Sequence, residues 1–502
     1  ELNSERMIKA ANGKRMKLLK VFTESLRFLK DDALNTINSQ INGIQFDASD
    51  FIWVLTVPVI WSHLARQFMR EAATKAGIIT EETGDKLVIA LEPEAASVWC
   101  KKLPSDDFIV KDDIRKPLEE TAGTRYIVVD CGGGTVDFTV HEVLESRALK
   151  ELYKASGNNL GGQSVDRKFR KFLREIFCDG VWDAYERDYP SELQQMMYDF
   201  AIHKQKNQDA EITCPPNLKE MANKNIGRFF KSVEGASFDG DYIKISRDKL
   251  RSFFDESLKG ISESLREIFK TGLHTGFVLL VGGYAQSQIL QDHIIDQFGD
   301  QCKVLCPIRA QETILRGAVE VGRNPEVVYS RKSSFTYGFA VCERFLESKH
   351  NEKKKFIVNG RAWSKDIFKK LVEKDEDIRW DETRQHLCIP ARANQVEMKL
   401  KFYSSLKNNP LYVDEEGAEE VGLLSVDVGK GGKVKTEIKF QTEIRATGTN
   451  LITGQKKEIK ITFMTKDQEC VIEGDTEETS ESKCVIDGPV LGEVLDGADR
   501  ST

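Results

Sequence analysis

The chain has 502 residues, 40% of them hydrophobic and 30% charged, and carries a formal net charge of −7. This composition is that of a globular protein long enough for two or three domains, and it excludes fibrous and low-complexity chains. The longest apolar stretch, residues 51–61, is interrupted by Pro58 and is shorter than the ~20 residues that cross a bilayer, so we expect no membrane span. No basic cluster interleaved with aromatic residues indicates nucleic-acid binding.

The first hundred residues alternate strand and helix patterns. Residues 52–57 predict a strand, and residues 62–77 predict a helix with one apolar face, which Ser62 can cap and Gly77 can end. A further short strand runs directly into Glu92. Such alternation is typical of helices layered on a sheet, so we expect an α/β fold.

The most informative segment is residues 126–138, which read YIVVDCGGGTVDF. A β-branched run ends in Asp130, three glycines follow at 132–134, and a second strand pattern begins after Thr135. Glycines without Cβ atoms let backbone N–H groups close on an anion, and Asp130 places a carboxylate where a hydrated Mg²⁺ can be held. Taken alone, the segment can equally be an ordinary glycine-rich hairpin.

Two more glycine turns follow. The turn within residues 157–166 enters an amphipathic helix, and the turn within residues 277–287 follows a buried strand. Residues 163–275 are mostly helical in pattern and highly charged. A short strand at 303–305 and a helix at 312–321 complete this part of the chain.

Beyond this helix the pattern changes. Residues 396–402, 434–444 and 459–463 alternate apolar and polar or charged side chains with period two, which is typical of antiparallel strands with one apolar face. We therefore expect a separate β-rich domain at 326–466, joined to the preceding part by a polar hinge at 322–325.

The end of the chain is acidic. Residues 467–502 hold 11 Asp or Glu against one Lys and one Arg, with few large apolar side chains, so we expect a disordered tail. The ten cysteines are scattered without the spacing of a disulfide framework, and neither they nor the seven histidines have metal-site spacing. Scattered thiols fit a reducing compartment, so we expect a cytoplasmic protein.

Four motifs occur in a recognisable order: Glu-Pro-x-Ala-Ala at 92–96, Asp-x-Gly-Gly-Gly-Thr at 130–135, Leu-Gly-Gly at 160–162 and Val-Gly-Gly at 281–283. This order resembles the nucleotide-binding domain of the 70-kDa heat-shock chaperones. Residues 51–77 are more similar to the divergent 12A/12B branch of that family, and the likeness extends over all but the tail.

The resemblance implies a fold. It predicts an actin-like, two-lobed α/β domain of the hexokinase and heat-shock ATPase type at 1–325, followed by the β-rich domain. The first lobe would comprise 1–124 and 307–325, and the second lobe 125–306. The β-rich domain would bind protein or peptide partners, because it stands where the family carries its peptide-binding module.

The first phosphate loop of the family, an Asp-x-Gly-Thr-Thr hairpin, does not occur before residue 126. We therefore expect an N-terminally incomplete nucleotide domain in a fragment of a longer protein. With half of the phosphate clamp missing, this chain would be a weak ATPase at most.

The resemblance also implies a ligand, ATP or ADP with Mg²⁺, and the residues that hold it. Asp130 and Glu92 would hold the metal through water, and with Thr135 they form the expected catalytic set. The nucleotide-binding residues implied in the same way are Gly132, Gly133, Gly134, Thr135, Gly161, Gly162, Lys204, Gly282, Gly283 and Tyr284.

Several of these assignments have plain alternatives. Glu92 can be an acid that merely caps a strand end, and Lys204 can be a solvated lysine. Ala201 stands where the chaperones keep a glutamate, which weakens the expected grip on the ribose and base. Gly282, Gly283 and Tyr284 would shape the adenosine pocket, and Gly161 and Gly162 would form the facing wall.

Two functions are therefore compared. The first is an ATP-binding, chaperone-like protein that couples its nucleotide state to the β-rich domain. The second is a non-hydrolysing scaffold or interaction protein, in which the actin-like fold survives but nucleotide binding is weak or lost. A sugar kinase on the same fold is disfavoured, because a β-sheet module follows the nucleotide domain.

Overall fold

The structure is a computed structural model, and it describes residues 6–463 except for 11–12, 42, 81, 110–120, 179, 223–225, 359, 389–396, 428–432, 441 and 460. The predicted acidic tail at 467–502 lies outside the described residues. No helix among the described residues is long and apolar enough to cross a membrane.

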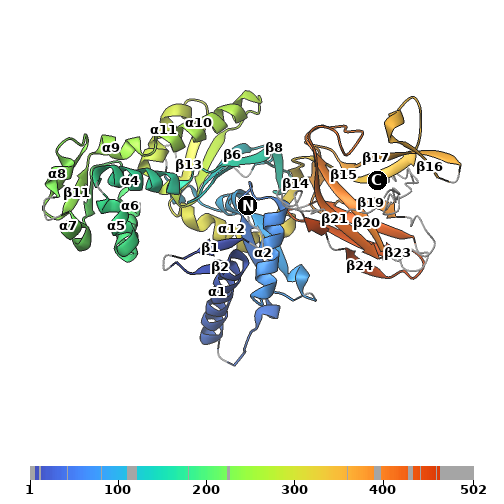
Figure 1. Ribbon diagram of the computed structural model, residues 1–502, viewed down its shortest axis with the longest axis horizontal. Helices are drawn as coiled ribbons and strands as arrows, with labels where there is room; N and C mark the ends of the chain where they lie inside the picture. The colour runs from blue at the N-terminus through green and yellow to red at the C-terminus, as the bar shows by residue number, and fades with distance from the viewer. Residues whose placement is uncertain are drawn as a thin grey trace, which may run out of the picture.

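A mixed sheet of eight strands forms the centre of the molecule (Figure 1). The predicted hairpin lies in the middle of this sheet. Its strands β6 (Arg125–Cys131) and β7 (Val136–Val143) run antiparallel on either side of the glycine turn, and β12 runs parallel to β6. In spatial order the strands are β18 (Asp377–Arg379), β14 (Val328–Lys332), β8 (Leu149–Asn158), β7 (Val136–Val143), β6 (Arg125–Cys131), β12 (Phe277–Val281), β13 (Lys303–Pro307) and β5 (Phe108–Ile109).

The two faces of β6 bury different cores. Ile127, Val129 and Cys131 pack in one cluster with the helices that follow the hairpin, whereas Tyr126 and Val128 pack in another cluster with residues of helix α3 (Glu92–Cys100). Successive side chains of a strand point to opposite faces, which explains this alternation. Asp130 therefore lies on the face that points toward α3.

The part of the chain before the hairpin holds a two-stranded parallel sheet of β3 (Trp53–Val57) and β4 (Leu87–Leu91). The predicted helix is confirmed as α2 (His63–Lys75): the Ser62 hydroxyl accepts a hydrogen bond from the Ala65 amide, and Gly77 has a φ of +74°. The remaining elements here are β1 (Met7–Lys9), β2 (Arg15–Lys17), α1 (Leu18–Gln40) and α3 (Glu92–Cys100).

Residues 163–275 are largely helical, as predicted, but they also contain a sheet that the sequence pattern did not indicate. Its strands β10 (Ala236–Asp239), β11 (Tyr242–Ile245) and β9 (Ala210–Thr213) have only four residues each, too few for a clear period-two pattern. The helices are α4 (Gly162–Ile176), α5 (Val181–Asp188), α6 (Pro190–His203), α7 (Pro216–Met221), α8 (Gly227–Phe230), α9 (Arg247–Ser252) and α10 (Asp255–Lys270). Figure 1 shows most of them at the end of the molecule opposite the β-rich part.

Two further helices frame the end of this part. Helix α11 (Gln288–Phe298) follows the third glycine turn, and α12 (Thr313–Arg323) packs closely on α3. A Cβ on Gly317 of α12 would meet the Ala95 carbonyl oxygen at 1.6 Å, so only glycine allows this approach. The expected hinge at 322–325 is helical as far as Arg323, which corrects the sequence interpretation of its first two residues.

Beyond residue 335 most of the described strands lie in a six-stranded and a four-stranded antiparallel sheet. The two share one hydrophobic core, which includes Phe339 and Phe402 from the larger sheet and Ile438 from the smaller. The predicted period-two pattern is confirmed along β22, where alternate residues are buried. The strands are β15 (Thr336–Arg344), β16 (Lys355–Val358), β17 (Arg361–Val372), β19 (Thr383–Cys388), β20 (Glu397–Ser405), β21 (Ala418–Asp427), β22 (Val434–Phe440), β23 (Ile444–Asn450), β24 (Lys456–Ile459) and β25 (Ile461–Phe463).

Strands β14 and β18 do not belong to these two sheets. β14 pairs in parallel with β8 and antiparallel with β18, so both extend the edge of the large central sheet. Residues on the β-rich side of the expected boundary are thus hydrogen-bonded to the α/β part. The chain between the two parts is an integral strand rather than a free linker.

Candidate functional site

The site is built on the β6–β7 hairpin. Its turn is closed by a hydrogen bond of 3.0 Å from the Gly132 amide to the Thr135 carbonyl oxygen, and Asp130 pairs in register with Asp137 across the two strands. Because cross-strand partners point to the same face, the two carboxylates lie side by side beneath the glycine turn. Both side chains are buried, and the Thr135 hydroxyl donates to Asp137 Oδ2 at 2.8 Å.

Glu92 completes a cluster of three acids. It is the first residue of α3, directly after β4. Burial and the nearby charge of Asp137 raise the pKa of Glu92 to about 7. Burial raises the pKa of Asp137 to about 6, although the Thr135 hydroxyl and the amides of Ile60 and Val59 act in the opposite direction. The alternative, that Glu92 only caps a strand end, does not explain why it lies near the Asp137 carboxylate.

The pKa of Asp130 is affected by both of the other acids. Burial, with the charges of Glu92 and Asp137, raises the pKa of Asp130 well above its usual range. Among the described residues, neither of its carboxylate oxygens has a hydrogen-bond partner, and Asp137 Oδ1 has none either. Buried polar atoms are nearly always satisfied, so unpaired acidic oxygens at one place indicate a site that is suited to a cation or to shared protons.

The residues fit a hydrated Mg²⁺ better than a directly ligated metal. Carboxylate oxygens are the donors that Mg²⁺ prefers, and the ion usually keeps several of its water ligands. Among the described residues, no three His, Cys, Asp or Glu side chains come close enough together to ligate one ion. Asp130 and Glu92 would therefore hold Mg²⁺ through its water, and this assignment from the family resemblance stays a prediction.

The other two glycine turns close on the hairpin. The amides of Gly162 and Gln163 donate to the carbonyl oxygens of Gly132 and Gly133, at 3.0 and 2.8 Å. A Cβ on Gly161 would lie 2.7 Å from those two oxygens. All of these contacts are backbone contacts, so side-chain movement cannot relieve them. The turn at the start of α4 thus fixes the shape of the hairpin turn.

Gly282 makes a similar approach from the third turn. Its φ is +86°, and a Cβ there would lie 2.5 Å from both Asp130 Oδ1 and the Cys131 carbonyl oxygen. By contrast, Gly283 has helical backbone angles, and a Cβ on it would meet nothing within 4 Å. The structure therefore brings the three sequence-predicted turns together around Asp130, with Gly282 as the closest contact.

Tyr284 and Lys204 lie beside these turns, but both are engaged with protein partners. Tyr284 is buried, and its hydroxyl donates to Ser257 Oγ at 3.1 Å. The Lys204 ammonium donates to Asp166 Oδ1 at 2.6 Å and to the Gly162 carbonyl oxygen at 2.9 Å. With 12% of its side chain exposed, Lys204 is not a solvated lysine, so that alternative is wrong.

The two expected walls of an adenosine pocket lie close together, with room for only about one methyl group between Gly162 and Tyr284. A Cβ on Gly162 would lie 3.4 Å from Tyr284 Cβ and Cγ and 3.5 Å from Lys204 Nζ, which is ordinary packing distance. The tyrosine ring also stacks on Phe254, with ring centroids 5.9 Å apart. A nucleoside between these walls requires the Tyr284 ring or the Lys204 ammonium to move.

Sequence reasoning missed two parts of the site. Asp137 lies within the motif that it singled out, and the register of a tight hairpin could have identified it as the partner of Asp130. The second is a buried ion pair from α3 to β14: Arg331 Nε lies 2.6 Å from Glu94 Oε1, and Arg331 Nη2 lies 2.8 Å from Glu94 Oε2. No local signal connects residues so far apart in the chain.

Comparisons with known proteins support the resemblance. No protein-family model matches the chain. Heat shock 70 kDa protein 12A of Mus musculus and that of Homo sapiens are each 33% identical to it over 532 aligned residues, which cover 92% of this chain and 78% of either relative. Heat shock 70 kDa protein 12B of Homo sapiens is 29% identical, with the same shares covered.

Proposed function

Since this chain belongs to the divergent 12A/12B branch of the 70-kDa heat-shock protein family, we propose that it binds ATP or ADP with Mg²⁺ at the three glycine turns. The observation that carries the proposal is Asp130, a buried carboxylate without a hydrogen-bond partner in the described part of the chain, enclosed by the hairpin turn and by Gly282. An unpaired buried carboxylate is costly, and a hydrated cation above it would remove that cost.

Each residue has a distinct role in this proposal. The amides of residues 132–134 and the Thr135 hydroxyl hold the phosphates, while Asp130 and Glu92 hold metal-bound water. Bound Mg²⁺ would neutralise phosphate charge and favour transfer of the terminal phosphoryl group to water. Glu92 would accept a proton from that water as a general base. The catalytic set remains Glu92, Asp130 and Thr135, and the activity would be slow.

We further propose that nucleotide binding is coupled to the β-rich part through α3. Glu92, at the first position of this helix, lies in the site, and Glu94, two residues later, pairs with Arg331 of β14. The backbone of the next residue, Lys332, donates to Glu151 Oε2 of β8 at 2.8 Å. A shift of α3 on nucleotide binding would therefore act on the strand that leads into the β-rich part.

Helix α2 offers a second connection. The amides of Val59 and Ile60, just before this helix, face Asp137. Farther along α2, Arg70 forms a two-pronged ion pair with Glu443 of the β-rich part, with N–O distances of 2.7 and 2.6 Å. Arg66 Nη1 also donates to the Thr442 carbonyl oxygen at 2.7 Å. Both helices thus run from the acid cluster to the β-rich part.

The function of the β-rich part, residues 326–466, is proposed from the family. We propose that its two sheets form a unit with its own core that binds protein or peptide partners in a nucleotide-dependent way. Every cysteine with a described side chain is a free thiol, which suits a reducing compartment such as the cytoplasm.

One observation favours the second candidate function, a non-hydrolysing scaffold. Tyr284 is hydrogen-bonded to Ser257, and Lys204 is paired with Asp166, so both groups expected at the nucleoside are engaged with the protein itself. If rearranging these two side chains costs more free energy than binding the nucleoside provides, the protein would not bind nucleotide and its actin-like fold would only bind partners.

Calorimetric titration with ATP, in the presence and absence of Mg²⁺, separates the two functions. We expect saturable, Mg²⁺-dependent binding that Asp130→Ala weakens at least about tenfold. Cys131→Ala is the matched control, because its side chain points to the opposite face of the same strand, and it should leave binding within about twofold. Absence of binding, or greater damage from Cys131→Ala, would refute the nucleotide site and favour the scaffold.

A further inference from the structure

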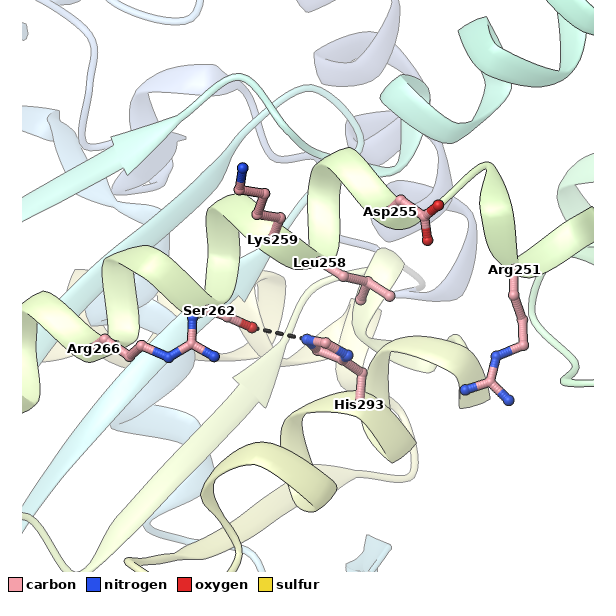
Figure 2. Close-up of a pocket in the computed structure, with 7 residues that line it drawn as sticks. All are labelled: Arg251, Asp255, Leu258, Lys259, Ser262, Arg266 and His293. Carbon is pink, nitrogen blue, oxygen red and sulfur yellow. Dashed lines mark hydrogen bonds between the residues drawn. The ribbon is translucent and has the colours of Figure 1, made fainter. Parts of the chain in front are cut away.

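A second concave site lies away from the glycine turns, between α9 and α10 on one side and α11 on the other. It is a cavity of about 340 Å³, lined by Arg251, Asp255, Leu258, Lys259, Ser262, Arg266 and His293. Figure 2 shows His293 of α11 beneath α10, with Arg266 to one side and Arg251 to the other. Neither the proposed nucleotide site nor the coupling route uses any of these side chains.

The lining is strongly biased toward positive charge. Of the three cationic lining side chains, Lys259 is already paired with Glu263, 4.0 Å away, so Arg251 and Arg266 carry the excess charge against the single lining carboxylate, Asp255. A hollow with excess guanidinium groups is suited to an anion, because each group presents parallel N–H donors to phosphate or carboxylate oxygens.

Two of the lining groups are held in place by neighbours. His293 Nε2 lies 2.8 Å from Ser262 Oγ, which fixes the plane of the imidazole (Figure 2). Arg266 Nη2 donates to Gln297 Oε1 at 2.6 Å, and the guanidinium lies over the Phe298 ring, 5.9 Å from its centroid. Both partners of Arg266 belong to α11, so α10 and α11 together set the position of its charge.

The pKa of His293 depends on the charged groups around this cavity. Burial and the charges of Arg266 and Arg251 lower the pKa of His293, and the carboxylates of Asp296 and Asp255 oppose them only in part. The groups around the imidazole come from all three helices: Arg251 from α9, Asp255 and Arg266 from α10, and Asp296 from α11 itself. An anion between the arginines would reverse the balance and favour the protonated imidazole.

We propose that this cavity is a binding site for a small phosphate monoester. Such a group carries a charge of about −2 at pH 7, which matches the two arginines and a histidine that gains a proton on binding. Ser262 and His293 supply further polar groups. Leu258 offers apolar surface to the organic part of the ester, and the volume exceeds that of a phosphate alone. The inference is independent of nucleotide binding at the glycine turns.

The test uses the full chain with ¹³C-labelled histidine side chains, and inorganic phosphate and glycerol phosphate as probes. The His293 resonance is assigned with His293→Gln and followed as a function of pH at increasing concentrations of either probe. We expect saturable binding that raises the pKa of His293, with glycerol phosphate binding more tightly than inorganic phosphate. No change at His293 at saturating probe would overturn the site.

Charge variants distinguish a built site from general surface charge. Arg251→Gln and Arg266→Gln should each weaken binding, read at His293, by about tenfold. Arg247→Gln, on α9 but outside the cavity lining, is the matched control and should change it by less than about twofold. Equal losses in all three variants would refute the proposal. Because the readout is His293 itself, the result does not depend on whether ATP binds at Asp130.

Discussion

Removal of the buried Arg331 guanidinium should destabilise the large central sheet. In Arg331→Met the side chain remains long and apolar, but the Glu94 carboxylate loses both of its ionic contacts, at 2.6 and 2.8 Å. Glu94 is only 2% exposed, so water cannot replace the guanidinium. The ionised carboxylate would then be buried without a partner.

The expected magnitude follows from burial. Breaking a buried ion pair from one side costs about 3–5 kcal/mol, whereas exposed pairs contribute about 0–1 kcal/mol. Replacing both partners with apolar residues, as in Glu94→Leu with Arg331→Met, leaves no orphaned charge and should restore most of the loss. The single variant should therefore lower the urea midpoint by roughly 1 M, and the double variant by much less.

Urea denaturation followed by circular dichroism measures these shifts. Arg187→Met is the matched control, because Arg187 binds Asp188 with the same two-pronged geometry, 2.8 Å for each contact, on an exposed surface. It should move the midpoint little. If Arg331→Met behaves like Arg187→Met, or if the double variant is as unstable as the sum of its singles, the pair does not hold β14 in the sheet.

Two further predictions concern the site and its edge. Gly282→Ala should lose about 1–3 kcal/mol of stability and most Mg-ATP binding, because the new Cβ meets Asp130 and the Cys131 carbonyl oxygen at a φ of +86°. Gly283→Ala is the control: a Cβ at Gly283 meets nothing, so this variant should be neutral in both thermal melting and calorimetric titration. Burial raises the pKa of Glu151 to about 8 from 4.5, so the folded protein binds this proton more tightly than the unfolded chain does. The free energy of unfolding should therefore fall as pH rises from about 4.5 to 8, by up to about 1.4 kcal/mol per pH unit. Glu151→Gln should remove that slope, and identical pH profiles of the two proteins would contradict the assignment.

Local sequence signals predicted the parts of the site that local chemistry dictates. The glycine turns, the strands before them and the Ser62 cap all depend on residues within a few positions of one another. The structure also brings the turns together: the Gly162 amide donates to the Gly132 carbonyl oxygen, and Gly282 lies against Asp130 and Cys131. The short strands β9 to β11 were missed because four residues are too few to reveal a period.

The remaining features depend on contacts between distant segments. Arg331 resembles any charged residue of a polar strand, and only the docking of β14 beside β8 turns it toward Glu94. Lys204 was expected at a nucleotide, yet its position beside α4 gives it Asp166 as a partner. Neither pairing has a spacing that a pattern can detect, because each requires the fold to exist first.

Amide hydrogen exchange with and without saturating Mg-ATP tests the central claim most directly, since one experiment observes both the site and the strand that leads from it. The account predicts slower exchange at residues 132–135, together with a changed rate along Val328–Lys332 of β14, and an unchanged rate along β22. Exchange that is the same everywhere with and without Mg-ATP would contradict nucleotide binding, and protection confined to the glycine turns would contradict the coupling through Glu94 and Arg331.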